Sequence, residues 1–250
     1  MNLIAFGKSD IGKVRKINQD AFGIFQKEDA GLFAVADGMG GYVDGEKASQ
    51  AVVAELSNWW DSFLPAKFGN EFQRMMTAIE QVIQYANGII YKQYNQNGIC
   101  GTTATVLLIY KNYYGIVHAG DSRCYLAQGN KWNLLTVDEV WENQSHISAR
   151  ERMMQNHPDR GKLVNAIGVG EHVRCRIVTD AVPVDAVFVL CTDGVYKFCE
   201  DRILKKCARK CKDKHAMEQE LERLTDTVYK NGAKDNMTII TVNCTSCKKA

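Results

Sequence analysis

The period of the hydrophobic positions changes along the chain, and three segments show helical spacing. Apolar residues recur every three or four positions over residues 45–63, over residues 70–94, and over residues 217–228, at Met217, Leu221, Leu224 and Val228. This spacing places the apolar side chains on one face, as in an amphipathic helix. We expect the first two helices to pack side by side, and Gly232 indicates where the third helix stops.

Short runs of continuously apolar residues lie between these helices. They comprise residues 31–36, 103–110, 113–119, 186–191 and 237–242. Their length and β-branched content favour strands, and the lack of polar alternation indicates that both faces of each strand are covered. Because strands outnumber helices and the helices occur in blocks, the pattern predicts an α+β fold with sheets between pairs of helices.

Residues 138–170 interrupt this pattern. The segment is polar and rich in Arg, Glu and Asn, which predicts a mobile excursion on the surface.

The whole chain has 250 residues and only 3 prolines, so a proline-rich linker is excluded. We therefore expect residues 1–250 to form a single domain.

Composition narrows the environment and the partners of the protein. The 31 Lys and Arg residues nearly balance the 29 Asp and Glu residues, which gives no electrostatic argument for binding nucleic acid or an anionic membrane. No apolar run approaches the roughly 18–20 residues that span a bilayer, and the first residues lack the features of a secretion signal. The odd count of 9 cysteines fits free thiols better than a disulfide framework, so we expect a cytoplasmic protein.

Aspartates lie directly beside the apolar runs. Asp37, Asp121 and Asp193 each follow a predicted strand, and Asp235 precedes the last one. A carboxylate in such a place is costly unless it is protonated or bound to a cation, and oxygen ligands with few His or Cys neighbours favour Mg²⁺ or Mn²⁺ over zinc. A single Asp-Gly pair is usually only a turn. The recurrence at four strand ends favours a shared cation site, although periodicity cannot show that the four meet in space.

Six stretches resemble, in order along the chain, the motifs of the metal-dependent protein phosphatases, the type 2C family of Ser/Thr phosphatases. They are SDIGKVRKINQDAFG at 9–23, VADGMGGY at 35–42, GTTAT at 101–105, HAGDSRCYL at 118–126, CTDGVY at 191–196 and KDNMTIITV at 234–242. The pattern is most similar to that of compact bacterial members. The resemblance implies a four-layer α-β-β-α sandwich, in which two antiparallel sheets are flanked by helix pairs.

The resemblance also implies a set of metal ligands for Mn²⁺ or Mg²⁺. Asp37 would bridge two ions, and the carbonyl of Gly38 would bind one of them. Asp193 and Asp235 would bind the other ion, and Asp20 would contact metal largely through water.

Further residues complete this implied site. Asp121 matches a residue that helps to hold a third ion in bacterial members, and Arg15 matches the arginine that binds the substrate phosphate. Asn236 would orient the neighbouring aspartate from outside the metal shell. Two positions depart from the family pattern: Met39 stands where some relatives have a histidine proposed to protonate the leaving group, and Gln19 replaces a frequent Glu. The general acid is therefore unassigned, with a metal-bound water as the substitute.

The implied function is the hydrolysis of phosphoserine and phosphothreonine in proteins by a metal-bridging water, in opposition to a Ser/Thr protein kinase. Two alternatives remain open: a phospho-binding regulatory pseudophosphatase, and a hydrolase of small phosphomonoesters. The excursion at about 138–170 corresponds to the family's flap beside the active site. Its basic residues Arg150, Arg152 and Arg160, with His157, would either meet a phosphorylated substrate or only keep the loop soluble.

A histidine and several cysteines are weaker candidates for function. His118 ends an apolar run and is expected to be a buried, hydrogen-bonded histidine and not a catalyst. Cys244 and Cys247 form one CxxC pair, and Cys207 and Cys211 are one helical turn apart. A zinc site that joins the four is disfavoured, because a lone CxxC pair is weak support for metal binding.

Overall fold

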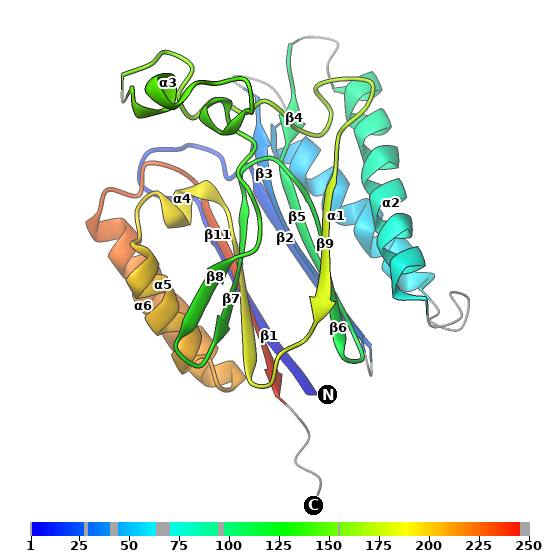
Figure 1. Cartoon of the computed structure of the whole chain (residues 1–250), viewed down its shortest axis with the longest axis vertical. Coiled ribbons are helices and arrows are strands. Elements are labelled where there is room, and N and C mark those ends of the chain that lie inside the picture. The colour runs from blue at the N-terminus through cyan, green and yellow to red at the C-terminus, as the bar shows by residue number, and fades with distance from the viewer. Residues whose placement is uncertain are drawn as a thin grey trace, which may run out of the picture.

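Two β-sheets lie face to face between two pairs of helices (Figure 1). The computed structural model describes residues 2–27, 30–40, 45–63, 71–94, 98–154 and 156–245. The sandwich has four layers, in the order helices, sheet, sheet, helices. The fold expected from the blocks of helices and from the resemblance is therefore confirmed.

The first sheet runs in the order β1-β11-β10-β7-β8, and all neighbouring strands are antiparallel. Its strands are β1 (Asn2–Asp10), β11 (Met237–Thr245), β10 (Ala186–Cys191), β7 (Arg123–Gln128) and β8 (Lys131–Leu134). Helices α5 (Asp201–Lys210) and α6 (Lys214–Lys230) cover its outer face (Figure 1). Gly232 follows α6 with a φ of 114°, a conformation that glycine adopts without strain and that suits the end of a helix.

The second sheet runs in the order β2-β3-β5-β6-β9 and is also antiparallel throughout. Its strands are β2 (Asp20–Lys27), β3 (Ala30–Met39), β5 (Ala104–Tyr110), β6 (Tyr113–Ala119) and β9 (Arg176–Ala181), and β4 (Gly101–Thr102) pairs with the end of β3. Helices α1 (Gly45–Asp61) and α2 (Phe72–Gln93) cover this sheet. The first residue of the predicted helix 70–94 lies outside the described residues.

Continuously apolar strands follow from this layering. In β3, Leu32 and Ala34 pack under the helices, whereas Phe33 and Val35 pack against the other sheet. Both faces of the strand are thus buried, so a polar alternation never arises. The same holds for β10, where Val189 faces the helices and Phe188 and Leu190 face the second sheet.

The five apolar runs and the three amphipathic segments all form the predicted type of element. The sequence did not predict β1, β2, β4, β7, β8 or β9, nor the short helices. In the segment 138–170, a 3₁₀ turn at Trp141–Asn143 is followed by α3 (Ala149–Met153), which begins with a capping box of Ser148 and Glu151. None of the helices in the described ranges has the length and apolar character needed to cross a bilayer.

Candidate active site

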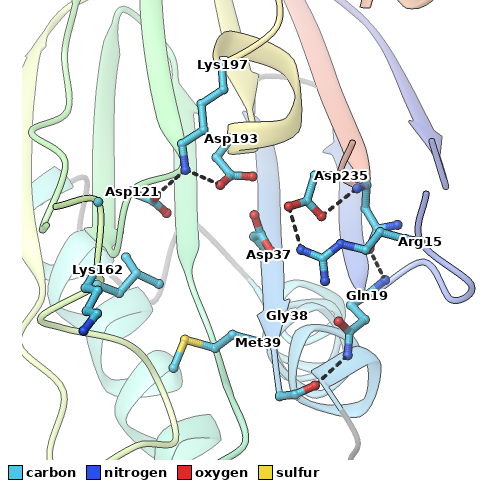
Figure 2. Close-up of a pocket in the computed structure, with 14 residues that line it drawn as sticks. Arg15, Gln19, Asp37, Gly38, Met39, Asp121, Lys162, Asp193, Lys197 and Asp235 are labelled. Carbon is cyan, nitrogen blue, oxygen red and sulfur yellow. Dashed lines mark hydrogen bonds and ion pairs between the residues drawn. The ribbon is translucent and has the colours of Figure 1, made fainter. Parts of the chain in front are cut away.

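Four strand ends bring four aspartates to one cavity of about 500 Å³ (Figure 2). Asp37 lies near the end of β3, Asp121 follows β6, Asp193 follows β10, and Asp235 precedes β11. Strands β3 and β6 are separated by one antiparallel strand, so they run in the same direction and end at the same edge of their sheet. Strand β10 ends where its antiparallel neighbour β11 begins. The topology therefore gathers residues that are far apart in sequence.

Asp20 lies beside this group, at the start of β2 and directly opposite Asp37 in the strand register. Its side chain is buried, and one carboxylate oxygen accepts a hydrogen bond from the hydroxyl of Thr192 at 2.8 Å. The other oxygen, Oδ1, is buried without a hydrogen-bond partner in the described part of the chain. A buried polar atom without a partner is rare and calls for a ligand or a proton.

Burial, and then the charge of neighbouring carboxylates, raises the pKa values of Asp37, Asp20 and Asp121. For Asp37 the pKa is well above its usual range, first because of burial and then because of the nearby charges of Asp20 and Asp193. Burial is also the main cause for Asp20, whose pKa is raised to about 7, and for Asp121, whose pKa is raised to about 6. In this arrangement the carboxylates favour either protons or cations.

Two basic side chains meet these aspartates in the cavity. Arg15 donates a hydrogen bond from its Nη2 to Oδ2 of Asp235 at 2.7 Å. Lys197 lies across the cavity and donates from Nζ to Oδ2 of Asp193 at 2.6 Å (Figure 2). The sequence analysis did not identify Lys197. The available signal was its position four residues after Asp193; Asp193 begins the short helix α4 (Asp193–Tyr196), and Lys197 is the residue that caps the end of this helix.

The donor set fits Mg²⁺ or Mn²⁺, because it consists of carboxylate oxygens and includes the unpartnered Oδ1 of Asp20. As the side chains stand, no three acidic, His or Cys groups among the described residues form a closed set of ligands. Asp235 and Asp193 are instead paired with Arg15 and Lys197. The chemistry of the ligands therefore matches a divalent ion, and these two aspartates have cationic partners within the chain.

Asn236 connects the loop of Arg15 to β11. Its side-chain Nδ2 donates to the carbonyls of Ile11 at 2.9 Å and Ile17 at 3.0 Å, and its Oδ1 accepts from the backbone N–H of Gln19 at 2.9 Å. The carboxylate of Asp235 accepts from the backbone N–H of Asn236, also at 2.9 Å. The Asn236 side chain thus holds the loop, whereas its backbone contacts the aspartate.

The remaining residues of the first motifs also lie at the cavity. Gly38, Met39 and Gln19 line it, and Gln19 donates from its side chain to the carbonyl of Gly40 at 3.4 Å. A methyl group on Gly38 would lie 2.2 Å from the carbonyl oxygen of Gly45, so this position accepts only glycine without a backbone shift. The motif 35–42 ends outside the described residues, since positions 41–44 are not described.

The excursion reaches the cavity through residues that the sequence analysis did not single out. Gly161, Lys162 and Leu163 line the cavity. The basic residues considered earlier make contacts within the excursion instead. Arg160 donates a hydrogen bond to the carbonyl of Arg152, which itself donates to the carbonyls of Gln144 and Ile147. The ring of His157 stacks on that of Trp141, with 3.8 Å between the ring centroids.

The weaker candidates lie away from the cavity. His118 is 2% exposed, contacts the Thr105 hydroxyl through Nδ1 at 2.9 Å, and has a pKa lowered by burial. It is thus a buried, hydrogen-bonded histidine, as expected. Cys207, Cys211 and Cys244 are buried free thiols, and Cys247, the other half of the CxxC pair, lies outside the described residues.

Comparison with known proteins identifies the relatives of this chain. The family model described as protein phosphatase 2C matches residues 7–239. The serine/threonine phosphatase Stp of Listeria welshimeri is 28% identical to this chain, in an alignment that covers 94% of this chain and 93% of that protein. The crystal structure of the Mycobacterium tuberculosis serine/threonine phosphatase PstP/Ppp superimposes with a TM-score of 0.80 at 26% identity, covering 98% of this chain and 99% of that one. A further structure, of the PstP catalytic domain in complex with two manganese ions, has a TM-score of 0.79 at 24% identity and covers 98% of this chain and 99% of that one.

Proposed function

The chain belongs to the protein phosphatase 2C family, and we propose that it is a metal-dependent hydrolase of phosphoserine and phosphothreonine in proteins. The observation that carries this proposal is a single cavity that is lined by four strand-end aspartates and by Arg15. Relatives named serine/threonine phosphatase, which match nearly the whole chain, support the same activity. We further propose that residues 1–250 act as one catalytic domain in the cytoplasm, in opposition to a Ser/Thr kinase.

The aspartates would hold Mn²⁺ or Mg²⁺. Asp37 would contact two ions, with the Gly38 carbonyl on one of them and Asp193 and Asp235 on the other. Asp20 would act mainly through water, and its unpartnered Oδ1 is available for this contact. When bound, divalent ions neutralise phosphate charge and lower the pKa of a water molecule so that it can attack near neutral pH.

Arg15 would bind the phosphate group of the substrate. Its side chain is 48% exposed at the cavity, so a phosphate can reach it without rearrangement of the core. A guanidinium forms two parallel hydrogen bonds to phosphate oxygens and retains its charge at any physiological pH. Asp235 orients the guanidinium in the absence of substrate.

Neither alternative function is favoured by an observation at the site. A pseudophosphatase would be expected to lack a metal ligand, but all the aspartates implied by the resemblance are present at or beside the cavity. A hydrolase of small phosphomonoesters would use the same chemistry, so only the choice of substrate separates it from a protein phosphatase. Aryl phosphates therefore do not discriminate between the two, whereas a panel of phosphoproteins does.

The decisive experiment measures phosphate release from a phosphothreonine peptide with Mn²⁺, without added metal and in chelator. We expect turnover only with the metal. Asp193→Asn removes one charged ligand and should lower kcat by at least about a thousandfold, because metal catalysis contributes several kcal/mol and each 1.36 kcal/mol is a factor of ten.

The matched control is Asp226→Asn, an exposed aspartate on α6, which should retain full activity. Circular dichroism should show both variants folded. Full turnover of Asp193→Asn, or of the wild type in chelator, would refute the metal assignment.

A further inference from the structure

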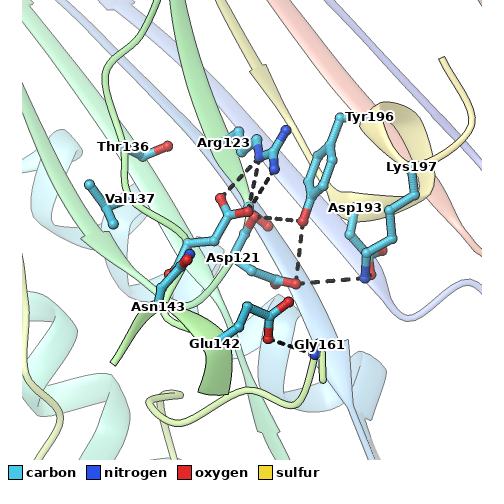
Figure 3. Close-up of polar contacts among 12 residues, drawn as sticks. Asp121, Arg123, Thr136, Val137, Glu142, Asn143, Gly161, Asp193, Tyr196 and Lys197 are labelled. Atoms are coloured by element: carbon cyan, nitrogen blue, oxygen red, sulfur yellow. Dashed lines mark hydrogen bonds and ion pairs between the residues drawn. The ribbon is translucent and has the colours of Figure 1, made fainter. Parts of the chain in front are cut away.

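Lys197 places one positive charge between two carboxylates from different strand connections: Asp121 lies between β6 and β7, and Asp193 follows β10. Asp193 opens α4 directly after β10, and Lys197 follows four residues later, so one helical turn brings the two side chains together. The lysine Nζ lies 2.6 Å from Oδ2 of Asp193 and 3.9 Å from Oδ2 of Asp121, which follows β6 (Figure 3). The ammonium thus connects the end of β10 to the segment that leads from β6 into the neighbouring strand β7.

The carboxylate of Asp121 is held in place toward this ammonium. The Tyr196 hydroxyl donates to the backbone carbonyl of Asp121 at 3.1 Å and to its Oδ2 at 3.3 Å. The Arg123 guanidinium lies 3.7 Å over the Tyr196 ring and is itself bound by Asp138, with Nη2 to Oδ2 at 2.7 Å (Figure 3). The Asp121 side chain is only 6% exposed, so it has little room to turn away.

The aspartates of the cavity therefore differ in how their charge is balanced. Neither Asp37 nor Asp20 has an ion-pair partner in the part of the chain that the structure describes, so both are available to an added cation. Asp121 and Asp193 share Lys197 instead. A divalent ion bound by Asp121 and Asp193 together would occupy the space of the lysine Nζ, and two cations cannot share that space without strong repulsion.

We propose that Lys197 is a built-in cation that replaces the divalent ion Asp121 would otherwise help to bind, so that the protein holds one ion fewer than its aspartates could bind. This inference rests on the proposed metal-dependent function. Asp193 would remain a ligand of the ions near Asp37 through its other oxygen. The role of Asp121 is then to position Lys197.

The test is the number of Mn²⁺ ions bound per chain, measured by equilibrium dialysis and by titration calorimetry. Lys197→Met keeps the length of the side chain and removes its charge, and should bind one more Mn²⁺ than the wild type. Lys197→Gln, a second neutral variant, should do the same. Lys197→Arg keeps the charge and should match the wild type. Adding Asp121→Asn to Lys197→Met should abolish the additional ion.

Lys162→Met is the matched control. Lys162 lines the same cavity, but its Nζ pairs with Asp159 at 2.7 Å and not with the aspartates at the strand ends. Its removal should leave the ion count unchanged. If Lys197→Met and Lys162→Met each bind one more Mn²⁺ than the wild type, the result would show only that a lower positive charge attracts more metal, and it would overturn the proposal.

The remaining outcomes are also decisive. An equal count in wild type and folded Lys197→Met overturns the proposal, and a raised KM in that variant would then assign Lys197 to the substrate phosphate. If the wild type still hydrolyses phosphothreonine with Mn²⁺ in that case, the proposed function stands without the inference. A wild type that neither binds Mn²⁺ nor hydrolyses the peptide would refute both.

Discussion

Arg15 contacts Asp235 through a single charge-assisted hydrogen bond and has further donors left for a ligand. We expect Arg15→Ala to lower kcat/KM by about tenfold to a hundredfold, mainly through KM, because charge-assisted hydrogen bonds contribute about 1.5–3 kcal/mol. The kcat/KM of Arg15→Lys should lie between those of the wild type and Arg15→Ala, since lysine keeps the charge but lacks the planar pair of donors. Steady-state kinetics on a phosphothreonine peptide measures both variants. An unchanged kcat/KM in Arg15→Ala would remove this residue from the site.

At the scale of single residues, position beside an apolar run was the informative signal. It identified Asp37, Asp121 and Asp193 as candidate cation ligands, because a carboxylate at the end of a buried strand needs a compensating charge. The same reasoning could not assign Lys197. Its spacing from Asp193 is visible in the sequence, but its second partner, Asp121, lies 76 positions earlier in the chain and is brought near only by the pairing of β7 with β10. Arg15 was assigned only through the family resemblance, since a loop arginine between lysines would otherwise pass for a solvated side chain.

Among the elements, α4 and the start of β11 approach so closely that only glycine fits between them. A methyl group on Gly194 would lie 1.8 Å from the carbonyl oxygen of Asn236. Gly194→Ala should therefore lower the free energy of unfolding by about 1–3 kcal/mol or more, the usual cost of overpacking, and should disturb the loop of Asp235.

Gly88 provides the control, because it lies within α2 and an added methyl group there meets nothing within 4 Å. Gly88→Ala should raise the free energy of unfolding by about 0.5–1 kcal/mol, since alanine is the better helix former. Urea unfolding of the two variants measures both changes. Equal stabilities would contradict the close approach of α4 and β11.

The elements that the sequence did predict are those buried on both faces. The missed strands lie largely at sheet edges: β1 and β8 end the first sheet, and β2 and β9 end the second. Most residues of β9 are exposed and those of β1 are mainly half-buried, so neither strand shows a continuous apolar run. Hydrophobic pattern detects a strand through burial, and an edge strand is held mainly by backbone hydrogen bonds that any sequence can make.

For the whole molecule, a carboxylate that is buried near other carboxylates makes stability depend on pH in an unusual direction. In the metal-free protein the pKa of Asp20 is raised from 3.8 to about 7, so between these values the folded chain binds more protons than the unfolded chain. Stability contributed by this group is then lost as pH rises through that window. Asp20→Asn cannot ionise, so in chelator it should be more stable than wild type at pH 8 and similar to wild type at pH 5.

The expected gain at pH 8 is at least about 1 kcal/mol, which corresponds to about 2–4 °C in Tm for a chain of this size. Calorimetry in chelator at the two pH values measures it. With saturating Mn²⁺ at pH 8, the wild type should instead be more stable than Asp20→Asn, because the wild type then has a cation near Asp20 and the variant offers that cation a weaker ligand. A variant less stable than the wild type in chelator at pH 8 would show that Asp20 is not under electrostatic strain.

The meeting of the aspartates belongs to the whole molecule, and periodicity alone could not supply it. It depends on β5 lying between β3 and β6, and on β10 lying next to β11. Hydrophobic pattern gives the strands but not their order, because each apolar strand fits equally well at several places in a sheet. The family resemblance, carried by six motifs in sequence, did not state that order either, but it implied that these aspartates share one metal site.

Strand β1 has its neighbour at the far end of the sequence, since Asn2 pairs with Thr245 and Asp10 with Met237. During translation β1 therefore leaves the ribosome long before β11, and it stays without this partner until residues 237–245 have also been made. Strand β11 directly follows Asp235. The nascent chain therefore gains the last of the four cavity aspartates just before the strand that pairs with β1 and β10 in the first sheet. A ribosome-bound chain that stops before residue 235 should accordingly be inactive, because it lacks both Asp235 and the strand that pairs with β1.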